Sequence, residues 1–189
     1  MAETITLKID DLEVTVAPQT TILAAAASVG IDIPHLCHDP NWTIPPSSSC
    51  RLCLVAVDGA RTPVTSCSQH AANGMVVRTD TEKLRELRRM VLELLLSDHP
   101  QDCLTCEQGG GCSLQEYAYA LGVTESGYSD ITGSVEPRAV KDGPAIIYDR
   151  SKCILCGRCV EVCQNIQASG AIEFCGRGFD TEIALPPGK

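Results

Sequence analysis

Twelve cysteines in 189 residues are the most unusual feature of this sequence, which contains only seven Phe, Trp and Tyr residues. Eleven of the cysteines fall into three groups, each of which contains at least one C-x2-C pair. Clustered cysteines form disulfides in secreted proteins and bind metals in reducing compartments. The segment Met1–Asp11 has acidic residues and no apolar run of the kind an export signal requires. We therefore expect a cytoplasmic protein whose cysteines are metal ligands.

The group with the most specific spacing is C-x2-C-x2-C-x3-C, formed by Cys153, Cys156, Cys159 and Cys163. In bacterial ferredoxins the first three cysteines of this run bind one 4Fe-4S cluster and the fourth binds a different one. The sequence ends before a second run appears. We expect a further 4Fe-4S cluster if a C-terminal segment supplies that run. If the chain is complete, we expect Cys163 or Cys175 to be the fourth ligand of the cluster that Cys153, Cys156 and Cys159 bind.

A second group combines His99 with Cys103, Cys106 and Cys112. Three cysteines at close spacing leave one coordination position, and the adjacent histidine predicts a four-ligand site for a 4Fe-4S cluster. The glycines of segment 107–111 permit the backbone to fold closely around a bulky group because they lack Cβ atoms.

The remaining group is C-x12-C-x2-C-x13-C, formed by Cys37, Cys50, Cys53 and Cys67. A C-x2-C pair brings two thiolates to one metal, and the two distant cysteines complete the site. On spacing alone, a 2Fe-2S cluster and a four-cysteine zinc site both fit. Cys175 belongs to none of the groups, and its place in an apolar, strand-like segment predicts a small buried thiol.

Alternation and turn residues predict a small sheet with one helix before residue 80. The expected elements are strands Thr4–Ile9, Leu12–Val16, Leu52–Val57 and Met75–Thr79, with a helix capped by Thr20 or Thr21 and running to Val29.

From Thr81 the apolar period becomes helical. The buried face should carry Leu84, Leu87, Val91, Leu94 and Leu95, and a solvated face should carry Lys83, Arg85, Arg88 and Arg89. Thr79 and Glu82 have the spacing of a capping box. A second helix is expected near Ser113–Leu121, and a short strand at Ala145–Tyr148.

These patterns predict an α+β chain with four parts. The expected parts are a 2Fe-2S domain (1–80), a histidine-ligated 4Fe-4S module (81–122), a connector (123–144) and a partial 4Fe-4S ferredoxin-like domain (145–189).

The strand, strand and helix before Cys37 resemble the β-grasp 2Fe-2S ferredoxin domain, in the form with a long first cysteine gap. The His99 group resembles the histidine-ligated module that follows this domain in iron-only hydrogenases and in the large iron–sulfur subunit of respiratory complex I. The order of all three groups also resembles the diaphorase subunit of bidirectional hydrogenases and NAD-linked formate dehydrogenases. The resemblance covers essentially the whole sequence.

This resemblance implies one 2Fe-2S and two 4Fe-4S clusters in a module that relays single electrons. Its partners would be a flavin- or NAD(P)H-binding subunit and a terminal catalytic subunit or ferredoxin. We expect no catalytic centre within the sequence, since Gly109–Gly111 lacks the spacing of a dinucleotide-binding loop. A net charge of −9 argues against nucleic-acid binding, and no apolar run is long enough to cross a membrane. The alternatives are the N-terminal fragment of an iron-only hydrogenase and a structural multi-zinc protein.

Overall fold

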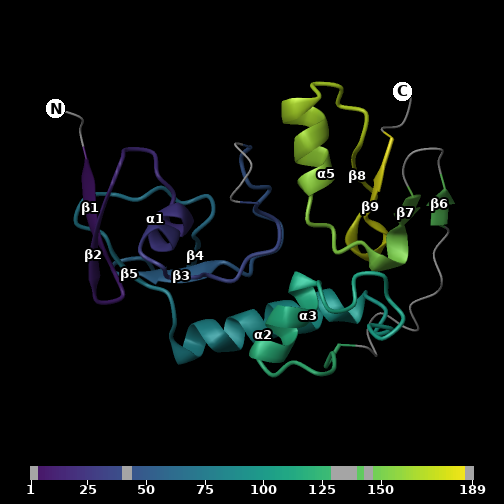
Figure 1. The fold of residues 1–189 in the computed structure, drawn as a ribbon, viewed down its shortest axis with the longest axis horizontal. Coiled ribbons are helices and arrows are strands. Elements are labelled where there is room, and N and C mark those ends of the chain that lie inside the picture. Colours follow the sequence, from purple (N-terminus) through teal and green to yellow (C-terminus); the bar gives the residue numbers. More distant parts are fainter. Residues whose placement is uncertain (1–3, 40–43, 129–139, 143–146, 186–189) are drawn as a thin grey trace. The chain divides into compact units, whose positions relative to one another are not determined.

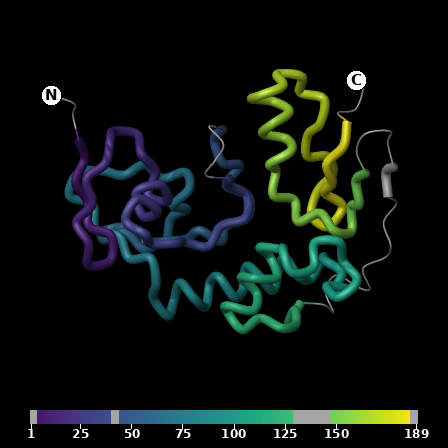
Figure 2. Tube along the Cα trace, viewed as in Figure 1, coloured from purple at the N-terminus to yellow at the C-terminus, as the bar shows by residue number. Residues whose placement is uncertain are grey.

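The computed structural model describes residues 4–39, 44–128, 140–142 and 147–185 of the chain. The chain divides into two compact units, Met1–Arg88 and Arg89–Lys189. Figures 1 and 2 follow the chain through both units. Each unit is described by itself.

The N-terminal unit is built on a five-stranded sheet with the strand order β2-β1-β5-β3-β4. Its strands are β1 (Ile5–Ile9), β2 (Leu12–Val16), β3 (Leu54–Val57), β4 (Val64–Thr65) and β5 (Val76–Arg78). β1 and β2 form an antiparallel hairpin, whereas β5 lies parallel to β1 and antiparallel to β3. The four predicted strands are confirmed. The two-residue β4 was not predicted, because two residues are too few to show an alternating pattern.

Helix α1 (Ile22–Ser28) contributes its apolar side chains to the core of the sheet. Thr21 is its N-cap, and the Thr21 hydroxyl accepts a hydrogen bond from the Ala24 amide at 3.2 Å. Its buried residues Ile22, Leu23, Ala25 and Ala26 belong to one core cluster with the inward residues of the sheet. Those sheet residues are Leu7, Ile9, Val14, Val55 and Val77.

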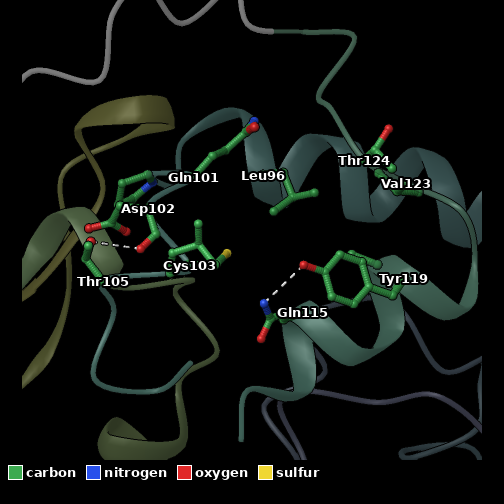
Figure 3. Close-up of a pocket in the computed structure, with 12 residues that line it drawn as sticks. Leu96, Gln101, Asp102, Cys103, Thr105, Gln115, Tyr119, Val123 and Thr124 are labelled. Atoms are coloured by element: carbon green, nitrogen blue, oxygen red, sulfur yellow. Dashed lines mark hydrogen bonds between the residues drawn. The ribbon is translucent and has the colours of Figure 1, made fainter. Parts of the chain in front are cut away.

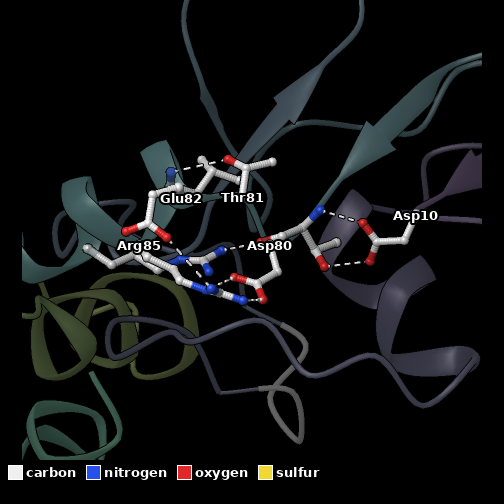
Figure 4. Close-up of polar contacts among 8 residues, drawn as sticks. Asp10, Asp80, Thr81, Glu82 and Arg85 are labelled. Carbon is white, nitrogen blue, oxygen red and sulfur yellow. Dashed lines mark hydrogen bonds and ion pairs between the residues drawn. The ribbon is translucent and has the colours of Figure 1, made fainter. Parts of the chain in front are cut away.

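Helix α2 (Glu82–Ser97) begins after Thr81, whose hydroxyl accepts the Leu84 amide at 3.2 Å. The predicted capping box at Thr79 is therefore wrong. The Asp10 carboxylate instead accepts the Thr79 amide and hydroxyl, at 2.8 and 2.7 Å. The Arg85 guanidinium donates from Nε to Asp80 at 2.8 Å. Figure 4 shows this contact and, separately, the hydrogen bonds of Asp10.

The buried face of α2 differs from the prediction. Leu84 and Leu92 are buried, but Leu94 is about half exposed, and Arg88 is only 4% exposed. Residues 84, 88 and 92 follow one another at the i, i+4 spacing that aligns side chains along one side of a helix. An arginine therefore occupies the middle of the buried face, and Arg88 is not on a solvated one.

The C-terminal unit consists of short elements connected by long loops. They are α3 (Ser113–Ala120), β6 (Val140–Asp142), β7 (Ile147–Asp149), η1 (Arg150–Lys152), α5 (Arg158–Glu161), the π-helical turn η2 (Val162–Ile166), β8 (Glu173–Cys175), η3 (Gly178–Asp180) and β9 (Glu182–Ala184). β6 pairs with β7 and β8 with β9, each antiparallel. The predicted second helix and the strand before Cys153 are confirmed, although Ala145 and Ile146 lie outside the described residues.

The second half of α2 packs in this unit against the segment that follows α3. Arg89 donates from Nε to the Leu121 carbonyl at 2.9 Å, and the Ser126 hydroxyl donates to the Glu93 carbonyl at 2.8 Å. Most of the predicted connector lies outside the described residues. None of the described helices combines the length and apolar character that a bilayer crossing needs.

Candidate metal centres

The four cysteines of the first group come from the loops beside β3 and β4. Cys37 lies in the loop after α1, Cys50 and Cys53 immediately precede β3, and Cys67 follows β4. Their side chains are between 1% and 6% exposed. Cys53 and Cys67 belong to the core cluster of this unit, so buried thiols account for part of its interior.

The thiols of this group form a connected set. The Cys37 thiol is within hydrogen-bond reach of Cys50 and Cys67, and both contacts lower the pKa of Cys37. A hydrogen bond from Cys67 lowers the pKa of Cys53 to about 6. The pKa values of Cys50 and Cys67 are raised, chiefly because their thiols donate to neighbouring sulfurs. The structure therefore brings all four predicted ligands together in one place.

Backbone contacts hold the C-x2-C loop of this group in a strained conformation. Arg51 has φ of 56°, in the left-handed region that non-glycine residues rarely adopt. The Ser66 hydroxyl and amide both donate to the Cys53 carbonyl, at 2.8 and 3.0 Å. Leu155, inside a C-x2-C pair of the third group, has a similar φ of 54°. Each pair therefore contains one backbone position that its surroundings keep out of the usual regions.

The Cys103 and Cys106 loop of the second group folds tightly against Gly109. The Cys106 amide donates to the Asp102 carbonyl at 3.0 Å, and the Gly109 amide donates to the Cys106 carbonyl at 2.9 Å. A Cβ added at Gly109 would lie 2.7 Å from the Cys103 carbonyl oxygen and 3.1 Å from that of Cys106. Only glycine fits here, as the sequence predicted for segment 107–111.

Two hollows adjoin the cysteines of this group. A cavity of about 460 Å³ is lined by Cys103, Leu96 and Tyr119 together with residues of the loop 100–105. Figure 3 shows Cys103 among these lining residues, with the Gln115 amide donating to the Tyr119 hydroxyl. A second hollow, of about 330 Å³, is lined by Cys112, the N-cap residue of α3. The loop therefore has open space beside two of its thiols.

His99 lies at the end of α2, with its Nδ1 atom 2.9 Å from the Pro100 carbonyl oxygen. A carbonyl oxygen only accepts, so this contact places the ring proton on Nδ1. In the neutral ring, Nε2 is then the nitrogen that can bind a metal.

In the third group the Cys159 thiol lies close to Cys153 and Cys156. Cys159 is exposed, and partial burial of its thiol together with the charges of these two neighbours raises the pKa of Cys159. Burial also raises the pKa of Tyr148 to about 12, and its hydroxyl is within hydrogen-bond reach of the Cys153 sulfur. Tyr148 thus stays protonated, and its hydroxyl is a donor towards the Cys153 sulfur.

The fourth cysteine of the run has its own set of neighbours. The Cys163 sulfur lies 3.1 Å from the Ser169 hydroxyl and accepts the Ala171 amide at 3.2 Å. These donors lower the pKa of Cys163, the Ser169 contact most. Cys175 in β8 is partly exposed, 3.8 Å from the Leu185 carbonyl. The prediction of a buried thiol at Cys175 is wrong, because the two-stranded β8–β9 ribbon is too small to cover it.

Two ion pairs join the loop of the second group to that of the third. Arg150 lies 3.6 Å from the Asp98 carboxylate, and Lys152 lies 3.7 Å from that of Asp102. Arg150 is 4% exposed, and its Nη1 atom has no hydrogen-bond partner among the described residues. The segments that carry His99 and Cys153 therefore lie side by side.

Sequence reasoning did not assign a role to Arg88, Tyr148 or Arg150. Arg88 and Arg150 contact segments far away in the sequence, which no local signal reveals, and Tyr148 precedes Cys153 without belonging to the cysteine spacing. Within the described parts of the chain, no three His, Cys, Asp or Glu side chains are arranged to hold a single metal ion.

Three family models match the chain in consecutive segments. Residues 2–82 match a 2Fe-2S iron-sulfur cluster binding domain. Residues 88–127 match the NADH-ubiquinone oxidoreductase-G iron-sulfur binding region, and residues 146–165 match a 4Fe-4S binding domain. These descriptions agree with clusters rather than zinc at the cysteine groups.

Individual relatives extend the similarity over nearly the whole chain. It is 40% identical to the NADPH-Fe(3+) oxidoreductase subunit alpha of Geobacter sulfurreducens over 98% of its length, and 39% identical to the NADP-reducing hydrogenase subunit HndD of Solidesulfovibrio fructosivorans over 95%. It is 36% identical to the mitochondrial NADH-ubiquinone oxidoreductase 78 kDa subunit of Candida albicans over 93%. The chain spans 21%, 31% and 24% of these three relatives, in the same order.

A chain of an NAD+-reducing nickel–iron hydrogenase, solved in its H2-reduced state, has a similar structure. The TM-score is 0.85 with 33% sequence identity, over 96% of this chain and 75% of that one.

Proposed function

The chain belongs to the family of iron–sulfur subunits found in NADH-quinone oxidoreductases and NAD(P)-linked hydrogenases, and we propose that it relays single electrons within such a complex. The bound clusters supply one-electron oxidation and reduction. The protein contributes ligands, spacing, exclusion of water and local charge. Two kinds of cluster-binding domain are present in the chain.

The proposed ligands are those of the three groups. Cys37, Cys50, Cys53 and Cys67 hold a 2Fe-2S cluster, and their buried, mutually bonded thiols support this. His99, Cys103, Cys106 and Cys112 hold one 4Fe-4S cluster, and Cys153, Cys156 and Cys159 hold a second. Cys163 serves a further ferredoxin-type cluster, as its separate neighbours suggest, or completes the second 4Fe-4S site.

The domains follow from the same assignment. Residues 1–80 form a β-grasp 2Fe-2S domain, for which the parallel β1–β5 pair beside a hairpin and one helix is the support. Residues 81–122 form the histidine-ligated module, 123–144 the connector and 145–189 a partial ferredoxin-like domain. Ligation by His99 is supported by its Nδ1 contact, which leaves Nε2 for iron.

The main support for the relay proposal is that two ion pairs connect segment 98–102 with segment 150–152. Each of these segments adjoins proposed ligands in the sequence, His99 and Cys103 for the first and Cys153 for the second. Electron transfer between two clusters requires a short distance between them. Two ligand loops that are joined by ion pairs would hold their clusters at such a distance. A single structural zinc site would need no such connection between loops.

The proposed partners are a flavin- or NAD(P)H-binding subunit and a terminal catalytic subunit or ferredoxin. The relatives named above are subunits of NADH-, NADPH- or NADP-linked enzymes. The cytoplasm is the proposed location, because none of the twelve cysteines is in a disulfide, as expected in a reducing compartment. The N-terminal part of a larger hydrogenase is the second candidate, favoured by the match to subunit HndD.

The experiment is metal analysis combined with electron paramagnetic resonance on anaerobically purified protein. We expect iron and acid-labile sulfide, a 2Fe-2S signal and at least one 4Fe-4S signal after reduction. Cys53→Ser should affect the 2Fe-2S signal alone, and Cys106→Ser a 4Fe-4S signal alone. Protein that is colourless and contains zinc without iron would refute the electron-relay function.

A further inference from the structure

Arg88 is a buried cation at the back of the first cysteine group. It lies in the middle of the buried face of α2 and is 4% exposed. Its Nη2 atom donates to the carbonyls of Leu54 and Thr79, both at 2.8 Å, and its Nε atom donates to the Leu52 carbonyl at 3.3 Å. Leu52 and Leu54 are the residues on either side of Cys53, so the guanidinium holds the backbone around one proposed ligand.

The position of Arg88 is itself fixed through Thr79, which is bonded to Asp10. Asp10, in the β1–β2 turn, accepts both the amide and the hydroxyl of Thr79. The Thr79 carbonyl in turn accepts from Arg88. This chain of hydrogen bonds connects the β1–β2 turn to the Cys53 loop through one guanidinium.

Among the described residues, no carboxylate is bonded to the Arg88 guanidinium. None of the ion pairs among the described residues includes Arg88, although burying an unpaired charge is costly. Burial lowers the pKa of Arg88, and the charges of Asp80 and of the Cys53 thiol partly oppose this effect. The negative charges that offset the buried cation are therefore the Asp80 carboxylate, which contributes most, and the cysteine group at Cys53.

We propose that Arg88 is a positioning residue that raises the reduction potential of the 2Fe-2S centre by holding a buried positive charge behind Cys53. This inference rests on the proposed function. Four thiolates and two sulfides outweigh two ferric ions, so the centre is negative and becomes more negative on reduction. A fixed cation in a poorly solvated interior favours the more negative state. The three carbonyl contacts keep that cation at a constant distance.

The test separates the charge from the hydrogen bonds by redox titration of the full chain. Arg88→Gln keeps an amide donor but removes the charge, whereas Arg88→Lys keeps the charge but cannot donate to three carbonyls in a fork. The readout is the electron paramagnetic resonance signal of the reduced 2Fe-2S centre. It is recorded at a temperature at which 4Fe-4S signals are too broad to detect. Lys83→Gln is the matched control, because it removes an exposed positive charge from the same helix.

We expect Arg88→Gln to lower the equilibrium constant for reduction of the 2Fe-2S centre about tenfold. This corresponds to a reduction potential lower by about 59 mV for one electron. Arg88→Lys should stay within about threefold of wild type and show a broadened signal, since its loop is less constrained. Lys83→Gln should match wild type.

A wild-type potential in Arg88→Gln, or equal shifts in Arg88→Gln and Lys83→Gln, would overturn the inference. Loss of the centre from both Arg88 variants would also overturn it, since Arg88 would then be needed only for folding. If wild-type protein itself contains no 2Fe-2S centre, the proposed function has failed instead.

Discussion

The side chains around the proposed ligands differ from those of ordinary surface loops. Arg51 and Leu155 adopt left-handed backbone conformations inside C-x2-C pairs. Such a conformation costs about 1 kcal/mol for a residue with a Cβ atom. Tyr148 and Arg150 lie beside Cys153, one with its hydroxyl near the sulfur and the other with a buried nitrogen that lacks a partner among the described residues. These features are consistent with loops that are fully stabilised only when their cluster is bound.

The first prediction concerns His99. We expect His99→Cys to retain a 4Fe-4S cluster with a potential lowered on the order of 100 mV, since a thiolate replaces a neutral imidazole and adds negative charge. Redox titration followed by electron paramagnetic resonance measures the shift. His70→Cys is the control, because His70 is exposed and contacts the Gln19 carbonyl. An unchanged potential in His99→Cys would show that this histidine is not a ligand.

At the scale of the elements, the conformation of the loop before α3 depends on Gly109. Gly109 lies so close to the Cys103 and Cys106 carbonyls that a methyl group would collide with backbone atoms. Gly111, in the same loop, has open space within 4 Å of the point where a Cβ atom would lie, and its φ is not positive. The two glycines therefore form a matched pair for substitution.

We expect Gly109→Ala to reduce stability by about 1–3 kcal/mol and to lower the iron content, because the ligand loop must shift to relieve the contact. Gly111→Ala should retain the iron of wild type. Iron and sulfide analysis together with thermal unfolding measure both effects. Equal iron content in the two variants would contradict a close fit at Gly109.

Much of this arrangement follows from local sequence patterns. Strands such as Leu12–Val16 alternate clearly, and the ligand groups are evident from cysteine spacing alone. Arg88 was placed on the solvated face because its partners, the Leu52 and Leu54 carbonyls, precede it by more than 30 residues. Cys175 was predicted to be buried because the sequence does not reveal how little the β8–β9 ribbon covers. Contacts between distant segments, rather than local preference, account for both errors.

For the C-terminal unit as a whole, Arg150 is the main connection between two ligand loops. It contacts Asp98 on one loop and donates to the Phe179 carbonyl at 3.2 Å on another. The Lys152–Asp102 pair connects the same loops but is far more exposed. Buried ion pairs are sensitive to the loss of one partner, whereas exposed pairs contribute little.

Arg150→Met should therefore destabilise this unit by about 2 kcal/mol, and Lys152→Gln by less than about 1 kcal/mol. Thermal unfolding of the cluster-loaded protein measures the difference. The magnetic interaction between the two 4Fe-4S clusters should also weaken in Arg150→Met, since their loops separate. Equal effects of the two substitutions would show that Arg150 does not connect the loops.

The parallel pairing of β1 with β5 also has a consequence for biosynthesis. β1 leaves the ribosome before β5, its parallel neighbour in the middle of the sheet, which ends at Arg78. All four cysteines of the first group are made before that residue. During translation these thiols are therefore exposed until β5 emerges, and we expect alkylation of a stalled nascent chain to decrease sharply once residue 78 is outside the ribosome.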